Sequence, residues 1–330
     1  QAEHVPMHLG SLLGIIGEVY KKFPRDEIQP GDMFIGNDPY NGGGTHLNDI
    51  TIAAPIFAPN GTLVGWAANL AHHSDIGGKE PGSTCGDAVN IFQEGLKIPL
   101  VRVCRQGEPL QDILDFVLGN SRIPDERYGD LQAQIAANRV GARRLLDAYA
   151  RYGDLLIDCM HELQNYAQRR LKAGIQKLPD GTYHFEDYMD DAGVASPDPV
   201  KICVTITIQG DRLHVDFSGT QGQVNGPINI TWNGMLAAVF YSLKALIDPE
   251  SPSNAGIYRA FTVSAEPGMI VNAKNPAAVG ERIDTAMRIA DVVFGALAPA
   301  AGIRAMAGSN GGCTTALFSG ADPQDPDQYP

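Results

Sequence analysis

The chain has no long apolar run, no run of basic residues and no closely spaced pair of cysteines. Because a membrane-spanning helix needs about 20 consecutive apolar residues, no segment is predicted to cross a membrane. The 25 lysines and arginines are outnumbered by 38 aspartates and glutamates, which gives a net charge of −13. An acidic chain without a basic patch is not expected to bind nucleic acid or an anionic membrane surface. These absences exclude two broad classes of function.

The cysteines are odd in number and scattered along the chain: Cys85, Cys104, Cys159, Cys203 and Cys313. Without a CxxC pair they predict neither a zinc ribbon nor a disulfide framework. Buried free thiols in a reducing cytosol fit this pattern, so we expect a cytoplasmic protein. No secretory leader follows Gln1, and the last residues, DPQDPDQYP, have the composition of a loop. We therefore expect both ends to lie inside a longer polypeptide.

What the sequence does contain is 44% hydrophobic residues, enough for at least one large core, together with 37 glycines and 22 prolines. Strand-like and helical patterns occur in blocks rather than in strict alternation. This arrangement favours an α+β fold with mixed antiparallel sheets, interspersed helices and many loops. We expect three regions: an α+β region with a metal site over residues 1–125, a helical segment over 126–180 and a second α+β region over 181–330.

Hydrophobic spacing and turn residues predict the individual elements. The expected helices cover residues 9–19, 130–177 with interruptions at Gly141 and Gly153, 233–247, and 284–297. The expected strands cover residues 33–35, 50–57 and 260–264, with one hairpin turning at Asn60-Gly61, one at Asp180-Gly181, and an antiparallel pair joined at residues 209–211.

Histidine and aspartate gather in two short motifs of the first region. His46 and Asp49 form an HxxD pair, and His72, His73 and Asp75 form an HHxD cluster. Imidazole nitrogen and carboxylate oxygen suit divalent zinc, manganese or iron, and two or three such ligands leave a position open for substrate. Because a hairpin returns the chain to its starting point, the strand–turn–strand between the motifs would bring them together. The pattern therefore predicts a site for one divalent metal.

The same residues have a simpler interpretation. HxxD pairs arise by chance, adjacent histidines point in different directions, and polar loop residues often serve only to hydrogen-bond turns. If a metal is bound, at most one of the two adjacent histidines is a ligand. His73, Asp75 or Asp38 would then orient the ligands or move protons.

Other residues give weaker signals. His4 and His8 could share one face of a helix, although ordinary surface or core histidines explain them equally. The GGGTH segment lacks the lysine and hydroxyl of a P-loop. Cys85 lies in a loop where a nucleophile is conceivable, but no base stands at a recognisable spacing. Glu94 could be a general base, and a solvated carboxylate is the default interpretation.

Longer stretches resemble the hydantoinase B/oxoprolinase family. They include EHVPMHLGS, GDMFIGNDPYNGGGTHLNDITIAAPIF, ANLAHHSDIGG, IFQEGLKIP, LPDGTYHFEDYMDDAG and VDFSGTQGQVNGPIN, and they follow the family's order across essentially all 330 residues. Family members are longer at both ends, so this chain resembles their central portion. The resemblance implies the metal-bearing hydrolytic subunit of an ATP-dependent enzyme that opens a cyclic amide, such as 5-oxoproline or N-methylhydantoin.

The resemblance also implies site residues and a partner. His46, Asp49 and His72 match the metal-ligand positions, with the choice of His72 over His73 left open, and His73, Asp75 and Asp38 match neighbouring polar positions. The implied partner is an ATP-binding hydantoinase A-type subunit that carries ATP and magnesium, so we expect a hetero-oligomer.

Two alternatives remain open at this stage. A related branch of the family carboxylates acetone or acetophenone, and the chain would then be the metal-bearing subunit of a ketone carboxylase. The chain could also be a non-catalytic subunit that holds a metal only for structure. The identity of the metal and of the ring substrate is not predicted.

Overall fold

The computed structural model describes residues 12, 14–193, 196–304, 307–309 and 312. The α-helices are α2 (Ile15–Lys22), α3 (Gln111–Leu118), α4 (Pro124–Tyr152), α5 (Asp154–Ile175), α6 (Trp232–Ile247) and α7 (Arg282–Ala301). The strands are β1 (Met33–Gly36), β2 (Asp49–Phe57), β3 (Leu63–His72), β4 (Val101–Arg105), β5 (Glu108–Pro109), β6 (Gly181–Met189), β7 (Val200–Gln209), β8 (Arg212–Asp216) and β9 (Phe261–Ser264). Short 3₁₀ turns are η1 (Arg25–Glu27), η2 (Pro81–Ser83), η3 (Ile91–Gln93), η4 (Ile257–Arg259) and η5 (Gly302–Arg304). The predicted α+β class is confirmed.

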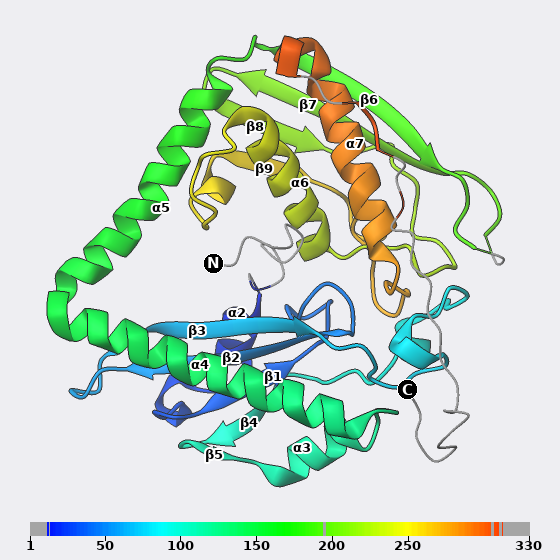
Figure 1. Ribbon diagram of the computed structural model, residues 1–330. Coiled ribbons are helices and arrows are strands. Elements are labelled where there is room, and N and C mark those ends of the chain that lie inside the picture. The colour runs from blue at the N-terminus through cyan, green and yellow to red at the C-terminus, as the bar shows by residue number, and fades with distance from the viewer. Residues whose placement is uncertain (1–11, 13, 194–195, 305–306, 310–311, 313–330) are drawn as a thin grey trace.

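The first sheet has the strand order β3-β2-β1-β4-β5, and every neighbouring pair is antiparallel. Helix α4 lies along one face of this sheet (Figure 1). Leu131 and Ile135 of α4 are buried in the core beneath it. On the same helix the side-chain amides of Gln134 and Asn138 donate to backbone carbonyls of β2, at 2.8 and 2.9 Å. Apolar burial and two amide hydrogen bonds therefore fix the helix on the sheet.

Helix α4 continues through Gly141, so the predicted interruption there is wrong. A glycine inside a helix costs only about 1 kcal/mol relative to alanine, and packing can offset that cost. A Cβ atom at Gly141 would lie 3.5 Å from Cβ of Ala67 in β3, so the glycine lets the helix approach the strand closely. The interruption predicted at Gly153 is confirmed, because this residue has φ +55° and separates α4 from α5.

The second sheet has the order β6-β7-β8-β9, with antiparallel pairs except for the parallel pair β8-β9. Helix α5 runs from the end of α4 up to this sheet, and α6 and α7 pack beside each other next to it (Figure 1). The largest apolar core lies here, between the sheet, α6, α7 and the second half of α5. The first half of α5 is largely exposed to solvent. Among the described residues, no helix is both long enough and apolar enough to cross a bilayer.

The structure differs from the predicted hairpin turn at Asp180-Gly181, and it describes only part of the first predicted helix. Asp180-Gly181 is not a hairpin turn, because Gly181 begins β6 and pairs with Ile208 at the far end of β7. Asp180 instead accepts a hydrogen bond of 2.8 Å from the backbone N–H of Gly210, in the turn that joins β7 to β8. The first helix begins at Ile15 in the described part, and the start of the predicted range lies outside it.

Helix α5 offers a matched pair of leucines for a stability measurement. Leu171 is fully buried in the larger core, whereas Leu155 on the same helix is 60% exposed. We expect Leu171→Ala to lower the free energy of unfolding by about 2–5 kcal/mol, because it leaves a cavity. Leu155→Ala should change it by less than about 0.5 kcal/mol. Urea denaturation monitored by circular dichroism measures both, and equal losses would contradict the described packing of α5.

Candidate functional site

The two histidine–aspartate motifs meet at one end of the β2-β3 hairpin. Asp49 is the first residue of β2 and pairs directly with His72, the last residue of β3. His46 stands just before β2, and its ring centroid lies 4.9 Å from that of His72. Nε2 of His46 lies 3.5 Å from Oδ1 of Asp49. The hairpin therefore brings His46, Asp49 and His72 together, as the spacing predicts.

The other carboxylate oxygen of Asp49 is held by two residues that sequence reasoning missed. Oδ2 accepts hydrogen bonds from the backbone N–H of Thr45 at 3.0 Å and from its hydroxyl at 2.7 Å. Nη2 of Arg282 lies 3.7 Å from the same oxygen, and its Nε donates to the Thr45 hydroxyl at 3.0 Å. Arg282 begins α7, so the second half of the chain reaches the site.

The loop before β2 needs a glycine at position 44. Gly44 has φ +76°, and a Cβ atom there would lie 2.5 Å from Cβ of Asp49. Such a contact is too close for any side chain, so the loop can fold over the aspartate only with glycine at this position. The GGGTH segment thus shapes the backbone around Asp49.

His46 lies in an environment that keeps its imidazole neutral. Only 5% of the residue is exposed. Burial lowers the pKa of His46 to about 4, and the positive charge of Arg282 acts in the same direction. Its Nε2 has no hydrogen-bond partner within the described residues. A neutral imidazole with an unused ring nitrogen can donate a lone pair to a metal.

The adjacent histidines face in different directions. His72 is exposed and lies beside His46, whereas His73 is buried and its Nε2 lies 3.0 Å from Oε1 of Gln134 on α4. Burial lowers the pKa of His73. Of the two, His72 is thus the one beside His46 and Asp49.

The two outlying aspartates hold loops through hydrogen bonds and ion pairs. Asp75 accepts from the backbone N–H of Arg122 at 3.0 Å and from its guanidinium at 2.9 Å. Burial acts to raise the pKa of Asp75, but these and other hydrogen bonds lower it overall. Asp38 pairs with Lys97 at 2.9 Å and accepts from the backbone N–H of Tyr40. A proton-transfer role for His73, Asp75 or Asp38 stays a prediction.

Glu94 is buried, so its default interpretation as a solvated carboxylate is wrong. It is 1% exposed, and its Oε1 accepts from the backbone N–H groups of Val279 at 2.7 Å and Gly280 at 2.6 Å. Burial raises the pKa of Glu94 to about 8. This residue therefore fastens the segment that leads into Arg282 to the first half of the chain.

The surroundings of Cys85 do not favour a nucleophilic thiol. Its Sγ donates to Asp87 at 3.1 Å, and burial raises the thiol pKa to about 11, so it stays protonated near neutral pH. Cys104 and Cys203 are buried free thiols, as predicted, but Cys159 on α5 is exposed. Cys313, like His4 and His8, lies outside the described residues.

The donor set fits a divalent cation in its chemistry, since it combines two imidazoles with a carboxylate. The buried Nε2 of His46 has no other hydrogen-bond partner in the described part of the chain. However, among the described residues no group of three or more histidine, cysteine, aspartate or glutamate side chains has the spacing needed to hold a metal ion. Within the described ranges, His46, Asp49 and His72 therefore converge without forming a closed ligand set.

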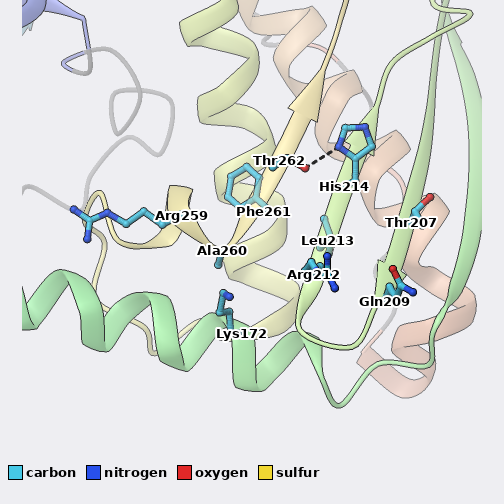
Figure 2. Close-up of a pocket in the computed structure, with 10 residues that line it drawn as sticks. All are labelled: Lys172, Thr207, Gln209, Arg212, Leu213, His214, Arg259, Ala260, Phe261 and Thr262. Atoms are coloured by element: carbon cyan, nitrogen blue, oxygen red, sulfur yellow. Dashed lines mark hydrogen bonds between the residues drawn. The ribbon is translucent and has the colours of Figure 1, made fainter.

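A pocket of about 300 Å³ lies elsewhere, between α5, β8 and the segment leading into β9 (Figure 2). Lys172, Arg212 and Arg259 line it, but Figure 2 shows the Arg259 guanidinium directed away from the other two. Lys172 also forms an ion pair with Asp211 at 3.0 Å. The positive charges do not converge on one point, so we assign no anion site here.

Comparison with known proteins identifies the family. The model of the family described as hydantoinase B/oxoprolinase matches residues 1–330. The chain belongs to this family. The hydantoinase B/oxoprolinase family resemblance seen in the sequence motifs is thereby confirmed.

Several relatives within the family match nearly the whole chain. Protein MJ0963 of Methanocaldococcus jannaschii is 37% identical over 97% of this chain and 56% of its own length. The caprolactamase subunit beta of Pseudomonas jessenii is 34% identical over 98% of this chain and 55% of its own. The 5-oxoprolinase of Saccharomyces cerevisiae is 31% identical over 96% of this chain and 25% of its own. The chain thus spans about half the length, or less, of these relatives.

Two solved structures share the fold. The ATP-dependent caprolactamase from Pseudomonas jessenii matches with a TM-score of 0.84 and 34% identity, over 91% of this chain and 51% of that chain. An acetone carboxylase in its nucleotide-free state matches with a TM-score of 0.82 and 19% identity, over 89% of this chain and 41% of that chain. At this lower identity the second match shows the fold alone.

The buried Glu94 of this hydantoinase B/oxoprolinase family chain should make stability depend on pH. Its folded pKa of about 8 lies above the ordinary value of 4.5, so the folded state binds the proton more tightly. Stability from this group is therefore present below about pH 4.5 and is lost as the pH rises through 8. Glu94→Gln mimics the protonated form and should remove this part of the decline.

Chemical denaturation of both proteins between pH 5 and 9 measures the effect. Glu250→Gln, at an exposed position, is the matched control and should keep the wild-type profile. Parallel profiles for the wild type and Glu94→Gln would show that Glu94 is ionised at neutral pH despite its burial.

Proposed function

We propose that this protein is the B-type hydrolytic part of an ATP-dependent enzyme that opens a small cyclic amide. Membership of the hydantoinase B/oxoprolinase family supports this, as do the names of the caprolactamase and 5-oxoprolinase relatives. The observation that carries the proposal is the meeting of His46, Asp49 and His72 at one end of the β2-β3 hairpin.

In this proposal His46, Asp49 and His72 hold one divalent cation, which would be zinc, manganese or iron. When bound, such a cation lowers the pKa of a water ligand from about 15.7 toward 7 and polarises an oxygen of the substrate. Burial keeps the His46 imidazole neutral and ready to bind. Thr45 and Arg282 fix one oxygen of Asp49, which leaves its other oxygen facing His46.

ATP and a partner subunit belong to the proposal for a chemical reason. An amide resists water because its carbonyl is stabilised by resonance and its nitrogen leaves poorly. Phosphorylation of the amide oxygen by ATP releases ADP and weakens that resonance. Water can then add to the ring carbon, and the C–N bond breaks to give an amine and an acyl phosphate. A second water releases phosphate and leaves a carboxylate, so the net reaction consumes two waters, one for the amide and one for ATP.

The ATP-binding step is assigned to a hydantoinase A-type partner. The chain has no P-loop motif. The name "subunit beta" of the caprolactamase relative supports the existence of a second subunit. We therefore place the activation step on the partner and the hydrolytic step on this chain.

The first test removes one proposed ligand. His46→Ala, assayed with the ATP-binding partner, should lose bound metal and lower ATP-coupled ring opening by about 10²-fold or more. Metal per chain is measured by plasma mass spectrometry, and product by chromatography. The control His161→Ala replaces an exposed histidine on α5 and should keep both. Full metal content together with full turnover in His46→Ala would falsify the assignment.

Chelation separates a catalytic metal from a structural one. Dialysis of the complex against a chelator should abolish turnover while shifting the melting temperature by less than about 4 °C, the shift expected for about 1 kcal/mol. Added zinc, manganese or iron should restore activity. Unfolding on chelation, with the partner's ATPase activity unchanged, would favour the structural role. The substrates tested should include acetone with bicarbonate, since a carboxylated product would point to the carboxylase chemistry.

A further inference from the structure

Strand β6 forms an open edge of the second sheet. It stands first in the strand order β6-β7-β8-β9, so within the described part of the chain only β7 pairs with it. Figure 1 shows it along the outer side of the sheet. It pairs with β7 from Gly181 to Met189 in an unbroken register. Proteins usually protect such an edge with proline, lysine, a bulge or a covering segment. Because β6 contains no proline, no lysine and no bulge, it is well formed for pairing with another strand.

The backbone groups of every second residue of β6 face away from β7. The backbone N–H groups of Lys201 and Cys203 in β7 donate to side chains that follow β8, at 3.2 and 3.1 Å, so they point away from β6. Lys201 is paired with Tyr188, and Cys203 with Glu186. In an antiparallel ladder, opposite residues exchange both hydrogen bonds or neither, and the two kinds of pair alternate. Tyr188, Glu186 and, by alternation, His184 therefore turn their N–H and C=O groups to the open edge.

The centre of this edge is accessible. His184 and Glu186 are exposed, and no hydrogen bond from another described residue reaches their outward backbone groups. Tyr188 differs, because the carboxylate of Asp187 accepts its N–H at 2.8 Å. A side chain thus closes one end of the edge, whereas the stretch around Phe185 stays open.

A second copy of the same strand fits this edge. Phe185 is the middle residue of β6, so two antiparallel copies overlap completely when Phe185 lies opposite Phe185 of the second copy. His184 of each copy then lies opposite Glu186 of the other, and each of these two pairs can exchange two backbone hydrogen bonds. An imidazole opposite a carboxylate is favourable, and like charges opposite each other are not. Registers centred on Glu186 or Asp187 would set two carboxylates opposite each other. The charge pattern therefore favours the register of complete overlap.

Phe185 supplies apolar surface at the centre of this register. It lies on the face of β6 that α7 covers, since a Cβ atom at Gly295 of α7 would lie 2.6 Å from its ring. Despite this contact, 40% of Phe185 is exposed at the edge. Opposite residues that exchange no hydrogen bonds have Cα atoms about 4.5 Å apart, so the two rings would be neighbours. Aromatic pairs across strands stabilise a sheet.

We propose that two copies of this protein associate through β6, which pairs antiparallel with β6 of the second copy about a two-fold axis at Phe185. The two four-stranded sheets then join into one continuous sheet. Both copies use the same residues, and the contact is closed, because each copy has its β6 edge covered by the other. This contact between like chains goes beyond the proposed function and does not rest on it.

Glu186→Pro tests the backbone pairing. Because the N–H of Glu186 faces the open edge, proline removes a donor from the proposed interface and none from the β6-β7 ladder. Sedimentation equilibrium of the whole protein, alone and with its ATP-binding partner, should show wild-type dimers and self-association at least about tenfold weaker in Glu186→Pro. The matched control Glu186→Ala keeps the N–H and should stay within about fivefold of wild type, because an exposed charge contact contributes little. Circular dichroism melting checks that both variants are folded.

Two further variants test the register without altering the backbone. His184→Glu sets two carboxylates opposite each other and should weaken self-association about fivefold or more, and adding Glu186→His should restore it. In a Cys159→Ser background, Phe185→Cys should form a disulfide between two copies under mild oxidation, because only the residue on the axis meets itself. Tyr188→Cys, on the same strand, is the control and should remain reduced.

The outcomes decide between a second copy and other occupants of the edge. Wild type that sediments as a monomer at every concentration, or Glu186→Pro that self-associates as tightly as wild type, overturns the proposal. Cross-linking through Tyr188→Cys in place of Phe185→Cys overturns the register and with it the axis. If Glu186→Pro leaves self-association unchanged but weakens binding of the ATP-binding partner, the edge recruits that partner and the proposal fails.

Discussion

The antiparallel register of β2 against β3 is the constraint on which the candidate site depends. It sets Asp49 opposite His72, and the ring of His46, three residues before Asp49, lies beside the ring of His72. Because side chains alternate between the two faces of a strand, a slip of one residue would exchange the positions of His72 and His73. The buried contact between His73 and Gln134 of α4 opposes such a slip, since His73 would lose its partner.

Although the proposed ligands all lie between residues 46 and 72, the site is completed from the other end of the chain. Arg282 reaches Thr45 and Asp49, and the segment before it is fastened by Glu94 through two backbone N–H groups. Tyr40 adds a third link, because its hydroxyl donates to the backbone carbonyl of Ala277 at 2.7 Å. The geometry around Asp49 therefore depends on how the two sheets are held relative to each other.

Much of this architecture was predictable because it is encoded locally. Alternating apolar residues and turn signals predict β2, β3, β7 and β8, and the hairpin alone brings the two histidine–aspartate motifs together. The proximity of Arg282 was not predictable, because no local pattern relates a helix start to a loop more than 200 residues earlier. The burial of Glu94 was missed for the same reason, since its partners are backbone groups of Val279 and Gly280.

Gly153 sets the angle between helices α4 and α5. Its backbone conformation, φ +55° and ψ −140°, is one that residues other than glycine rarely adopt. The bend between α4 and α5 is therefore concentrated in this single residue. The 22-residue helix α5 is about 33 Å long, so rotating it by ten degrees about Gly153 would swing its far end by roughly 6 Å. The hydrogen bonds of Glu94 to Val279 and Gly280 and of Arg282 to Thr45 span the same two halves, so all three would have to break before such a swing could occur.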